Sequence, residues 1–526
     1  MHRSATLLLF AIALTASATA TTYEVGDGKP YTSINAVPWE SLIAGDTVLI
    51  YWRAAPYLEK WVICRQGTAA APITVRGILG PNGERPIIDG NGATTRLPLD
   101  YWNETRGVLK IGGANIPADT MPSYIVIENL EIRAARPPYT FTDDAGNPGV
   151  YDNNAAAVYV EKGQNLTIRN CILHDCGNGL FIGPGGPPVT GNILIESNYI
   201  YGNGNVGSAF EHNTYTEALG ITYQYNRFGP LRAGCNGNGL KDRSAGLVVR
   251  YNWLEGGNRE LDLVDADGTP ALLNDPSYHT TFVYGNVLIE PPGDGNKQLT
   301  HYGGDSNVTA SYRKGTLYFY NNTLISQRTD STTLFRLSTN DEHCDARNNI
   351  IYVTAAGNSL GLLDQTGVLD MTHNWLKPGW RTSFSPLLGT INDDGTSVTG
   401  STPGFVSEPT QDFHLAAGSA CINAATTLNA AALPANDLTR QYVSHQQSAP
   451  RSLSGSAWDI GAFEFATAIP GDLNGDGHVD LTDLSILLSA YALCTGQPGF
   501  LPAADLDHNG CIDLADLAQL LSHYGT

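Results

Sequence analysis

The chain is poor in positive charge. Its 526 residues hold 30 Lys and Arg against 51 Asp and Glu, which gives a formal net charge of −21. Residues 466–526 contain eight Asp and no Lys, Arg or Glu, so the remainder carries −13. Nucleic-acid-binding proteins present basic patches, and we therefore expect no nucleic-acid partner.

Long apolar segments are missing after the first residues. Residues 1–20 have a short basic start, an apolar run from Leu7 to Leu14 and a small-residue Ala18-Thr19-Ala20 site, which predicts a cleaved secretory signal. No later stretch has the length needed to cross a bilayer. We expect an extracellular protein that does not span a membrane and is either released or held at the cell surface by a partner. Export permits disulfides, with Cys171/Cys176 and Cys494/Cys511 as local candidates.

Helical periodicity is scarce, whereas short β-rich runs recur. They read LTIRNCIL, ILIESNYI, ITYQYNRF, LVVRYNWL, TFVYGNVL, LYFYNNTL and CDARNNII, and each contains an Asn with an apolar residue two places on. The Asn are Asn170, Asn198, Asn226, Asn252, Asn286, Asn322 and Asn349, at steps of 26 to 36 residues. Strands of hairpins recur roughly every 8 to 12 residues, whereas a step near thirty is typical of one turn of a parallel β-solenoid. Equivalent residues then stack about 4.8 Å apart, so the Asn are expected to form a structural ladder.

Two further stretches carry a family resemblance. Residues 44–77, AGDTVLIYWRAAPYLEKWVICRQGTAAAPITVRG, resemble the start of the chondroitinase B and alginate lyase branch of the pectate-lyase-like group. DFHLAAGSACINAATT and DIGAFEF resemble the closing coils of secreted β-helix proteins. The resemblance implies an all-β fold, a right-handed parallel β-helix over residues 21–465, and a polysaccharide substrate. INAVPWESLI is amphipathic and is expected to cap the open N-terminal end.

The end of the chain repeats a loop. GDLNGDGHVDLTD is echoed by ADLDHNGCIDLAD 33 residues later. Both have the ligand spacing of a calcium loop, with a Gly at position 6 and a backbone carbonyl at position 7. The predicted ligands of the first loop are Asp472, Asn474, Asp476, His478 through its carbonyl, Asp480 and Asp483. Those of the second are Asp505, Asp507, Asn509, Cys511 through its carbonyl, Asp513 and Asp516.

Each loop precedes a stripe of apolar residues at i, i+3, i+4 and i+7, which predicts a short helix with one buried face. The stripes are Leu484, Leu487, Leu488 and Tyr491, then Leu517, Leu520, Leu521 and Tyr524. Two loop-helix units ending in Asp resemble a dockerin module, here residues 471–526 after a linker at 466–470. The resemblance implies two calcium ions and a cohesin-like receptor or cell-surface scaffold, with Leu481-Thr482 and Leu514-Ala515 at the partner-selecting positions. The alternative is a calcium-stabilised cap without a receptor.

Charged residues gather on successive coils between residues 211 and 265. Tyr215 and Lys241 each lie 11 residues before their Asn, so the spacing predicts that Tyr215 stacks on Lys241 and, by the same count, Glu217 on Arg243. The next strands are expected to add Glu260, Asp262 and His301. Alternation places Lys241 and Arg243 on one side and Asp242 on the other. Because charged groups are not expected inside a narrow solenoid, Lys241 and Arg243 should face a groove.

The cluster suits a lyase acting on a uronic-acid polymer. Lys241 is the candidate base, Arg243 the group that neutralises the uronate, and Tyr215 the proton donor to the leaving oxygen. Glu217, Glu260, Asp262 and His301 are candidate substrate contacts, and the carboxylates among them candidate ligands of a third calcium. In the resembling lyase branch the Arg follows the Lys by about one coil, and Arg259 is the nearest match to that pattern.

Three alternatives remain open. A glycoside hydrolase needs two carboxylates, and Glu260, Asp262 and Asp265 are candidates, since residues two apart on a strand lie roughly 6.6 to 7 Å apart. A non-catalytic glycan-binding or adhesive solenoid would use aromatic residues on an exposed groove, such as Tyr215, Tyr223 and Trp253. A salt-bridged, solvated face gives the same charge pattern with no chemistry.

Overall fold

We describe a computed structural model of the chain, with residues 19–266, 268–355, 359–465, 469–474 and 478–525 placed. The expected signal sequence and the predicted ligand Asp476 fall outside these ranges, apart from the last two residues of the signal. In the described part, no helix is long and apolar enough to cross a membrane.

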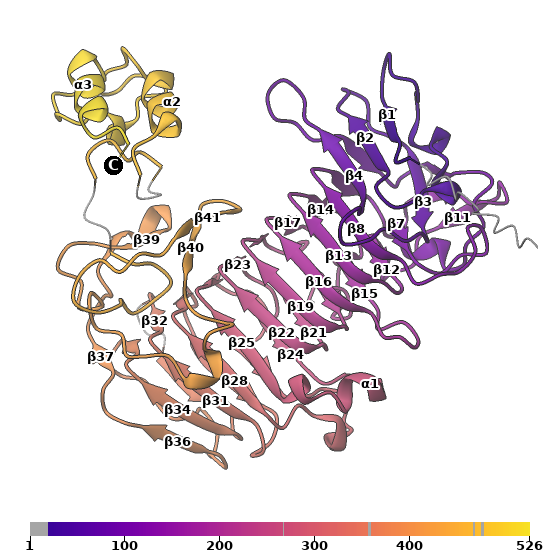
Figure 1. Cartoon of the computed structure of the whole chain (residues 1–526). Helices are drawn as coiled ribbons and strands as arrows, with labels where there is room; N and C mark the ends of the chain where they lie inside the picture. Colours follow the sequence, from indigo (N-terminus) through magenta and orange to yellow (C-terminus); the bar gives the residue numbers. More distant parts are fainter. Residues whose placement is uncertain (1–18, 267, 356–358, 466–468, 475–477, 526) are drawn as a thin grey trace, which may run out of the picture.

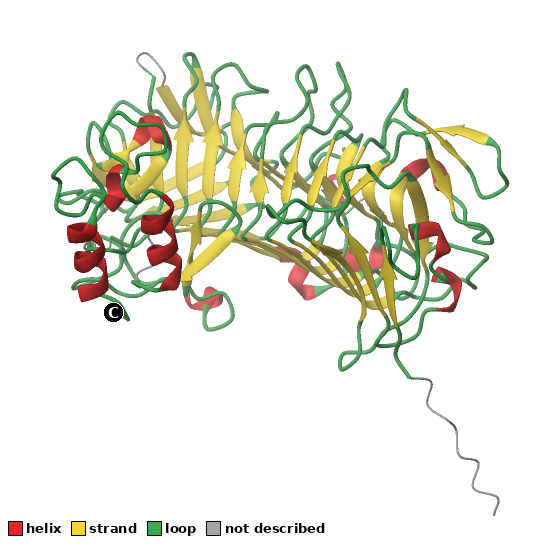
Figure 2. Ribbon diagram, turned by 90° about the horizontal axis from the view of Figure 1, so that it is seen from above, coloured by secondary structure: helices red, strands yellow, loops and turns green. Residues whose placement is uncertain are grey.

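Most of the chain is a parallel β-helix, in which the strands of successive coils lie side by side along the long axis (Figures 1 and 2). The first sheet contains, in order, β1 (Thr22–Val25), β2 (Thr47–Tyr51), β4 (Ile73–Ile78), β8 (Ser123–Glu128), β13 (Gln164–Arg169), β16 (Gly191–Glu196), β19 (Leu219–Gln224), β22 (Ala245–Arg250), β25 (Thr280–Tyr284), β28 (Thr316–Tyr320), β31 (His343–Arg347), β34 (Val368–Thr372) and β36 (Thr390–Asp393). The second contains β11 (Pro148–Val150), β10 (Thr140–Thr142), β6 (Ala93–Thr95), β3 (Glu59–Ile63), β7 (Gly107–Ile111), β12 (Ala156–Val160), β15 (Asn178–Ile182), β18 (Thr214–Thr216), β21 (Leu240–Asp242), β24 (Leu261–Leu263), β27 (Gln298–Tyr302), β30 (Ser331–Leu337) and β33 (Ser359–Leu363). The third contains β5 (Ile87–Asp89), β9 (Glu131–Arg133), β14 (Ile172–His174), β17 (Tyr199–Tyr201), β20 (Arg227–Phe228), β23 (Trp253–Glu255), β26 (Val287–Glu290), β29 (Thr323–Ser326), β32 (Ile350–Val353), β35 (Trp375–Leu376) and β37 (Val398–Thr399). The predicted all-β solenoid is therefore confirmed.

The turn between the first and third sheets holds the predicted Asn ladder. Each side-chain amide donates to the amide oxygen of the next coil, for example Asn226 to Asn252 at 2.9 Å and Asn252 to Asn286 at 3.0 Å. The ladder runs from Asn198 through Asn349 and continues to Asn374. Because every buried amide is paired, the ladder fixes the height of one coil on the next.

The first predicted member, Asn170, is wrong by one position. Cys171 occupies the ladder position of that coil, and its backbone N–H donates to the amide oxygen of Asn198 at 2.9 Å. Asn170 instead has φ 51°, as do the residues before the other ladder positions, such as Ser197 with φ 55° and Tyr251 with φ 54°. Asn tolerates the left-handed region better than most residues, so the sequence offers an Asn at either of two adjacent positions.

The N-terminal segment behaves as the amphipathic pattern predicts. It forms η1 (Ile34–Ala36) and η2 (Trp39–Ser41), whose apolar side chains Ile34 and Trp39 are fully buried. The Trp39 ring stacks on Trp61 at 5.0 Å.

The closing segment, residues 405–465, does not form further coils as the resemblance implied. It makes the hairpins β38 (Phe405–Ser407) with β39 (Asp412–Leu415) and β40 (Arg440–Val443) with β41 (Gln447–Pro450). It folds back along the outer face of the third sheet (Figure 1). There Phe413 and Tyr442 pack on Trp253. The reason is the apolar outer face of that sheet, which has to be covered.

Short helices complete the chain. They are η3 (Glu104–Arg106), α1 (Pro270–Leu273), η4 (Pro276–His279), η5 (Thr309–Ser311), η6 (Glu408–Thr410), η7 (Ala430–Ala432), α2 (Leu481–Ser489), η8 (Pro502–Ala504) and α3 (Leu514–Ser522). The two predicted terminal helices, α2 and α3, begin with capping boxes at Asp480 and Asp513. The disulfide Cys494–Cys511 is formed, as expected of that pair. Cys171 and Cys176 are buried free thiols, because they belong to the solenoid core.

Replacing one rung of the ladder tests its role. We expect Asn286→Ala to lower the free energy of unfolding by about 3 kcal/mol, because it leaves the buried backbone N–H of Asn252 without an acceptor and removes one bond of the Asn252 side-chain amide. Urea denaturation followed by tryptophan fluorescence measures this. The exposed Asn91→Ala is the control, and an equal effect of both substitutions would contradict a structural ladder.

Candidate functional site

A column of side chains runs along the outer face of the second sheet. The register pairs Tyr159 with Phe181, Phe181 with Tyr215, Tyr215 with Lys241, Lys241 with Asp262, Asp262 with His301, and His301 with Arg336. The flanking residues, such as Leu240 and Leu261, point into the core. The predicted stacking of Tyr215 on Lys241 is thus confirmed, and the column brings Asp262 and His301 beside them.

Lys241 lies at the centre of this column and is only 6 % exposed. Its Nζ donates to Asp262 Oδ2 at 2.6 Å and to Asp305 Oδ2 at 2.6 Å. Asp262 Oδ2 also accepts from the Asn238 amide at 2.9 Å. Two carboxylates from different coils therefore hold one ammonium group.

Arg243 lies two residues further on, just beyond the end of β21. Its Nε donates to the Tyr215 hydroxyl at 2.7 Å, its Nη1 to the Asp265 carbonyl at 2.6 Å, and its Nη2 to Asp305 Oδ1 at 2.7 Å. Burial opposes the charged form, but Tyr215 and Asp305 outweigh it, so the pKa of Arg243 is raised. Asp305 thus bridges Lys241 and Arg243 with its two oxygens.

Asp262 continues into a hydrogen-bonded relay. Its Oδ1 accepts from His301 Nδ1 at 2.8 Å, and His301 Nε2 lies 2.9 Å from the Ser338 hydroxyl. Burial alone would raise the pKa of Asp262, but Lys241 and His301 hold it well below its ordinary value. Burial also lowers the pKa of His301, so the imidazole is neutral near pH 7 and donates from Nδ1.

Tyr215 is packed between other rings. Phe181 stacks on it at 5.4 Å, and His212 lies at 5.7 Å. Burial raises the pKa of Tyr215, so its hydroxyl keeps a proton at neutral pH. Burial and the charge of Lys241 lower the pKa of His212 to about 3. Its Nδ1 accepts from the backbone N–H of Asn238 at 2.8 Å, which leaves Nε2 to carry the proton of the neutral ring.

These groups line a cavity of about 390 Å³. Four predicted residues contribute to it, namely Tyr215, Lys241, Arg243 and Asp262. It also contains residues that we did not predict, His212, Asn238 and Asp305, together with Arg259, which the family resemblance had suggested for a role. His212 carried a sequence signal, since it precedes the Tyr215 strand, whereas Asp305 lies in a side loop whose register no repeat fixes.

The remaining predicted residues do not line this cavity. Glu217 accepts a hydrogen bond from the Thr269 hydroxyl at 2.5 Å. His301 is 1 % exposed and lies behind Asp262. Glu260 is fully buried, on the interior side of the coil beside Glu290, and burial together with Glu290 raises its pKa well above the ordinary value.

The interior of the solenoid is more polar than expected. Asp242, predicted on the side opposite Lys241, is fully buried and lies 3.5 Å from the fully buried Arg313. The Thr216 hydroxyl donates to it at 2.7 Å and the Ser244 hydroxyl at 2.8 Å. The expectation that charges are excluded from the core was wrong here, because an opposite charge and two hydroxyls compensate the carboxylate.

The proposed aromatic platform is not formed. Tyr223 is fully buried in the core, and Trp253 is 2 % exposed beneath the closing segment. Tyr215 presents its ring faces to Phe181 and His212 rather than to solvent. The three rings therefore offer no open face on which a sugar would stack.

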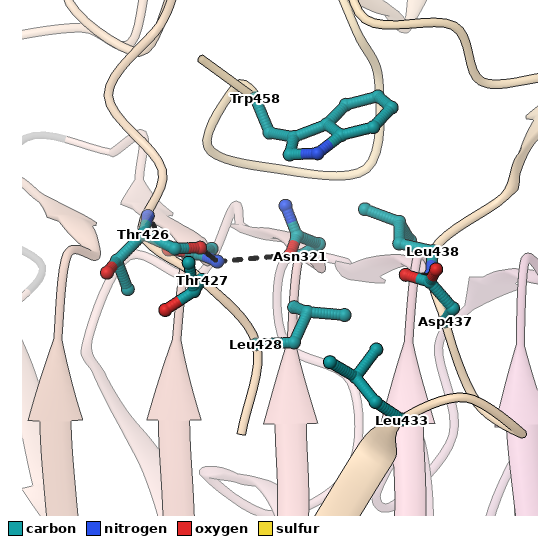
Figure 3. A pocket seen from close by; sticks show the side chains of 9 residues that line it. Asn321, Thr426, Thr427, Leu428, Leu433, Asp437, Leu438 and Trp458 are labelled. Atoms are coloured by element: carbon teal, nitrogen blue, oxygen red, sulfur yellow. Dashed lines mark hydrogen bonds between the residues drawn. The ribbon is translucent and has the colours of Figure 1, made fainter. Parts of the chain in front are cut away.

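A second cavity, of about 210 Å³, lies between the closing segment and the turn of the solenoid (Figure 3). Trp458, Leu433 and Leu438 line it, together with Asn321 and Asn348. The two Asn amides bond each other and backbone carbonyls of the closing segment. The amide groups that line it are therefore already used in these hydrogen bonds.

The second terminal loop fits a calcium ion. Asp505, Asp507 and Asp516 place ligand oxygens within 4.8 Å of one another, which is a metal-site arrangement of hard ligands. Asp516 is fully buried and also accepts from the backbone N–H groups of Leu506 and Asp513. Within the placed residues this is the one such group of acidic, His or Cys side chains, and none is found in the cavity at Lys241.

Calcium binding can be counted. We expect isothermal titration calorimetry to show two calcium ions per chain, and one in Asp516→Ala, because the carboxylates of the second loop repel one another without an ion. Asp341→Ala, at a site exposed to solvent, is the control. An unchanged count in Asp516→Ala would contradict the assignment.

The buried Glu260 predicts a pH effect on stability. The pKa of Glu260 is higher in the folded than in the unfolded protein. The contribution of protonated Glu260 to the free energy of unfolding is therefore fully present below about pH 4.3 and is lost as the pH rises toward the folded pKa. Glu260→Gln does not titrate, so the variant does not lose this contribution. We expect the free energy of unfolding of the variant, relative to that of the parent, to increase by at most about 1.4 kcal/mol per pH unit. Thermal unfolding between pH 5 and 8 measures the difference, and a constant difference would show that Glu260 does not titrate in this range.

Comparison with known proteins agrees with the architecture. Residues 146–324 match the right handed beta helix region, and residues 470–523 match the dockerin type I domain, a calcium-binding domain. No curated protein matches the chain.

Solved structures to which the chain is similar include the pectate lyase Pel9A, at 15 % identity and a TM-score of 0.47, covering 85 % of this chain and 98 % of that one. An alginate lyase from Paenibacillus sp. str. FPU-7 has 13 % identity and a TM-score of 0.39, covering 63 % and 92 %. A GH136 lacto-N-biosidase from Eubacterium ramulus has 13 % identity and a TM-score of 0.32, covering 72 % and 67 %. At these values no activity transfers to this chain. The chain therefore joins a parallel β-helix to a dockerin type I module.

Proposed function

We propose that the protein is an extracellular lyase that cleaves uronic-acid polysaccharides at the cavity around Lys241. The observation that carries this proposal is the pair of cations Lys241 and Arg243. Together they hold the two oxygens of one carboxylate, here that of Asp305, at 2.6 and 2.7 Å. A uronate needs such neutralisation before its α-proton can be removed. The phenol of Tyr215 lies against the same Arg243.

The reaction assigned to this geometry is a β-elimination. Lys241, whose ammonium group first loses a proton to solvent, takes the proton from the carbon α to the carboxylate, while Arg243 holds the carboxylate. The electron pair of the broken C–H bond forms the double bond, and the glycosidic C–O bond breaks. Tyr215 gives its proton to the leaving oxygen and recovers one by way of Lys241, so that the net transfer is from carbon to oxygen.

The hydrolase alternative has less support. Glu260 is fully buried and faces the interior, so it cannot act with Asp262 across a substrate. Asp262 is itself held by Lys241, Asn238 and His301. Asp265 is fully buried and accepts from the backbone N–H of Asp305.

The dockerin module is the part of the chain that would bind a partner. Leu481 and Leu514, at the partner-selecting positions of the two loops, are each 68 % exposed at the start of α2 and α3. Exposed leucines at equivalent places offer a surface to a cohesin-like receptor. Anchoring through it would hold the cavity near an insoluble polymer and raise its effective concentration there.

Ultraviolet absorbance tests the reaction. We expect incubation with alginate, pectate or chondroitin to raise the absorbance of unsaturated product for at least one polymer, and Lys241→Ala to reduce the rate by about 10²- to 10⁴-fold. Tyr215→Phe should reduce it similarly without unfolding the protein. Lys297→Ala, a half-exposed lysine paired with Asp330, is the matched control.

Two results would contradict the lyase. Release of reducing ends without the absorbance would indicate hydrolysis, and binding without either product would indicate a glycan-binding solenoid. Equal losses in Lys241→Ala and Lys297→Ala would show that Lys241 has no special part.

A further inference from the structure

Asp305 occupies the place that a substrate carboxylate needs. One of its oxygens lies 2.6 Å from Lys241 Nζ and the other 2.7 Å from Arg243 Nη2. Burial would raise the pKa of Asp305, but the two cations outweigh it and lower the pKa, so Asp305 is ionised. We propose that Asp305 is an internal ligand of a carboxylate-binding site, and that an acidic sugar binds by displacing it. The identity of the sugar rests on the proposed function, whereas the site itself does not.

The two cations keep their positions without Asp305. Lys241 retains Asp262 at 2.6 Å, and Arg243 retains the Tyr215 hydroxyl at 2.7 Å and the Asp265 carbonyl at 2.6 Å. The departure of Asp305 therefore leaves a preorganised pair rather than two mobile chains. Preorganised donors bind a carboxylate without the cost of ordering them.

The charges of the site favour replacement of the Asp305 carboxylate by another carboxylate over its departure alone. Lys241, Arg243 and Arg259 face the carboxylates of Asp262, Asp265 and Asp305, and both His212 and His301 are neutral at pH 7. Removing Asp305 leaves one uncompensated positive charge in a largely buried site. A ligand with one carboxylate restores the balance, whereas a neutral sugar does not.

The Asp305 side chain can leave the two cations while the backbone around it stays fixed. Gly303 has φ +134°, and Gly304 is tied to the Ser338 hydroxyl through its N–H at 2.9 Å. At the far end Arg313 is fully buried and donates to the Ser244 carbonyl at 2.8 Å. Between these anchors the loop is mostly exposed, with Val308 at 55 %. The backbone N–H of Asp305 donates to the buried Asp265 carboxylate at 2.8 Å, so the exchange needs only a rotation of the Asp305 side chain toward solvent.

Small carboxylates test the site without any enzymatic assay. In Asp305→Ala we expect a lower midpoint of thermal unfolding than in the parent, because two cations lose their partner. Sodium acetate at tens of millimolar should raise that midpoint by several degrees, and sodium chloride at the same ionic strength should not. The parent, whose site is filled, should respond to the two salts alike.

Two variants control this experiment. Asp330→Ala removes a carboxylate that pairs with Arg328 and Lys297 away from the cavity, and it should show no preference for acetate. Asp305→Asn keeps the size of the side chain and serves if Asp305→Ala fails to fold. An equal response of both Asp305 variants to acetate and chloride would overturn the inference.

Affinity for an acidic sugar tests the competition. We expect a galacturonate trimer to bind Asp305→Ala about tenfold more tightly than the parent in calorimetry, since no internal ion pair has to break. Weaker binding by the variant would overturn the inference and make Asp305 a substrate contact. Rescue by acetate without any binding of acidic sugars would contradict the proposed function while the carboxylate site stands.

Discussion

The hydrogen bonds between successive coils are the constraint on which the rest of this molecule depends. Parallel strands fix neighbouring residues at one spacing, and the Asn ladder removes the freedom of one coil to slip on the next. Once the register is set, residues more than twenty positions apart in the sequence become direct neighbours. Lys241 meets Asp262 in this way, and Asp262 meets His301.

The site uses this register in two ways. On the outer face it places aromatic rings, cations and a carboxylate in one line, so that Lys241 lies next to Asp262. On the inner face it buries Asp242 with Arg313 directly behind Lys241. The cavity floor is thus held from both sides by ion pairs, which limits the movement of Lys241 and Arg243.

The sequence predicts best those residues whose distance from a ladder Asn is the same in successive coils. The recurring Asn locates Tyr215 over Lys241, because both lie the same distance before their own ladder residue, and the structure confirms that pairing. It fails where the Asn could serve in two adjacent positions, as at Asn170 and Cys171. Asp305 was beyond reach, because it lies in a side loop whose path depends on tertiary contacts with Asp265 and Arg243. The interior position of Glu260 was also not predicted. Glu260 lies directly before β24, where the chain turns, and the alternation of a strand does not fix the direction of a side chain in the turn before it.

The closing segment connects coils of the solenoid that are not neighbours in the sequence. In most solenoids each coil relies on its neighbours in sequence, and shortening from the end removes coils one at a time. Here residues 405–465 lie across the third sheet and reach back as far as Ser197, whose carbonyl accepts from the Gln446 amide at 2.8 Å. Their contacts join coils far apart in the chain, including those that carry Trp253, Ile289 and Tyr352. The coils between Ser197 and Tyr352 are therefore completed by a segment that is synthesised after all of them.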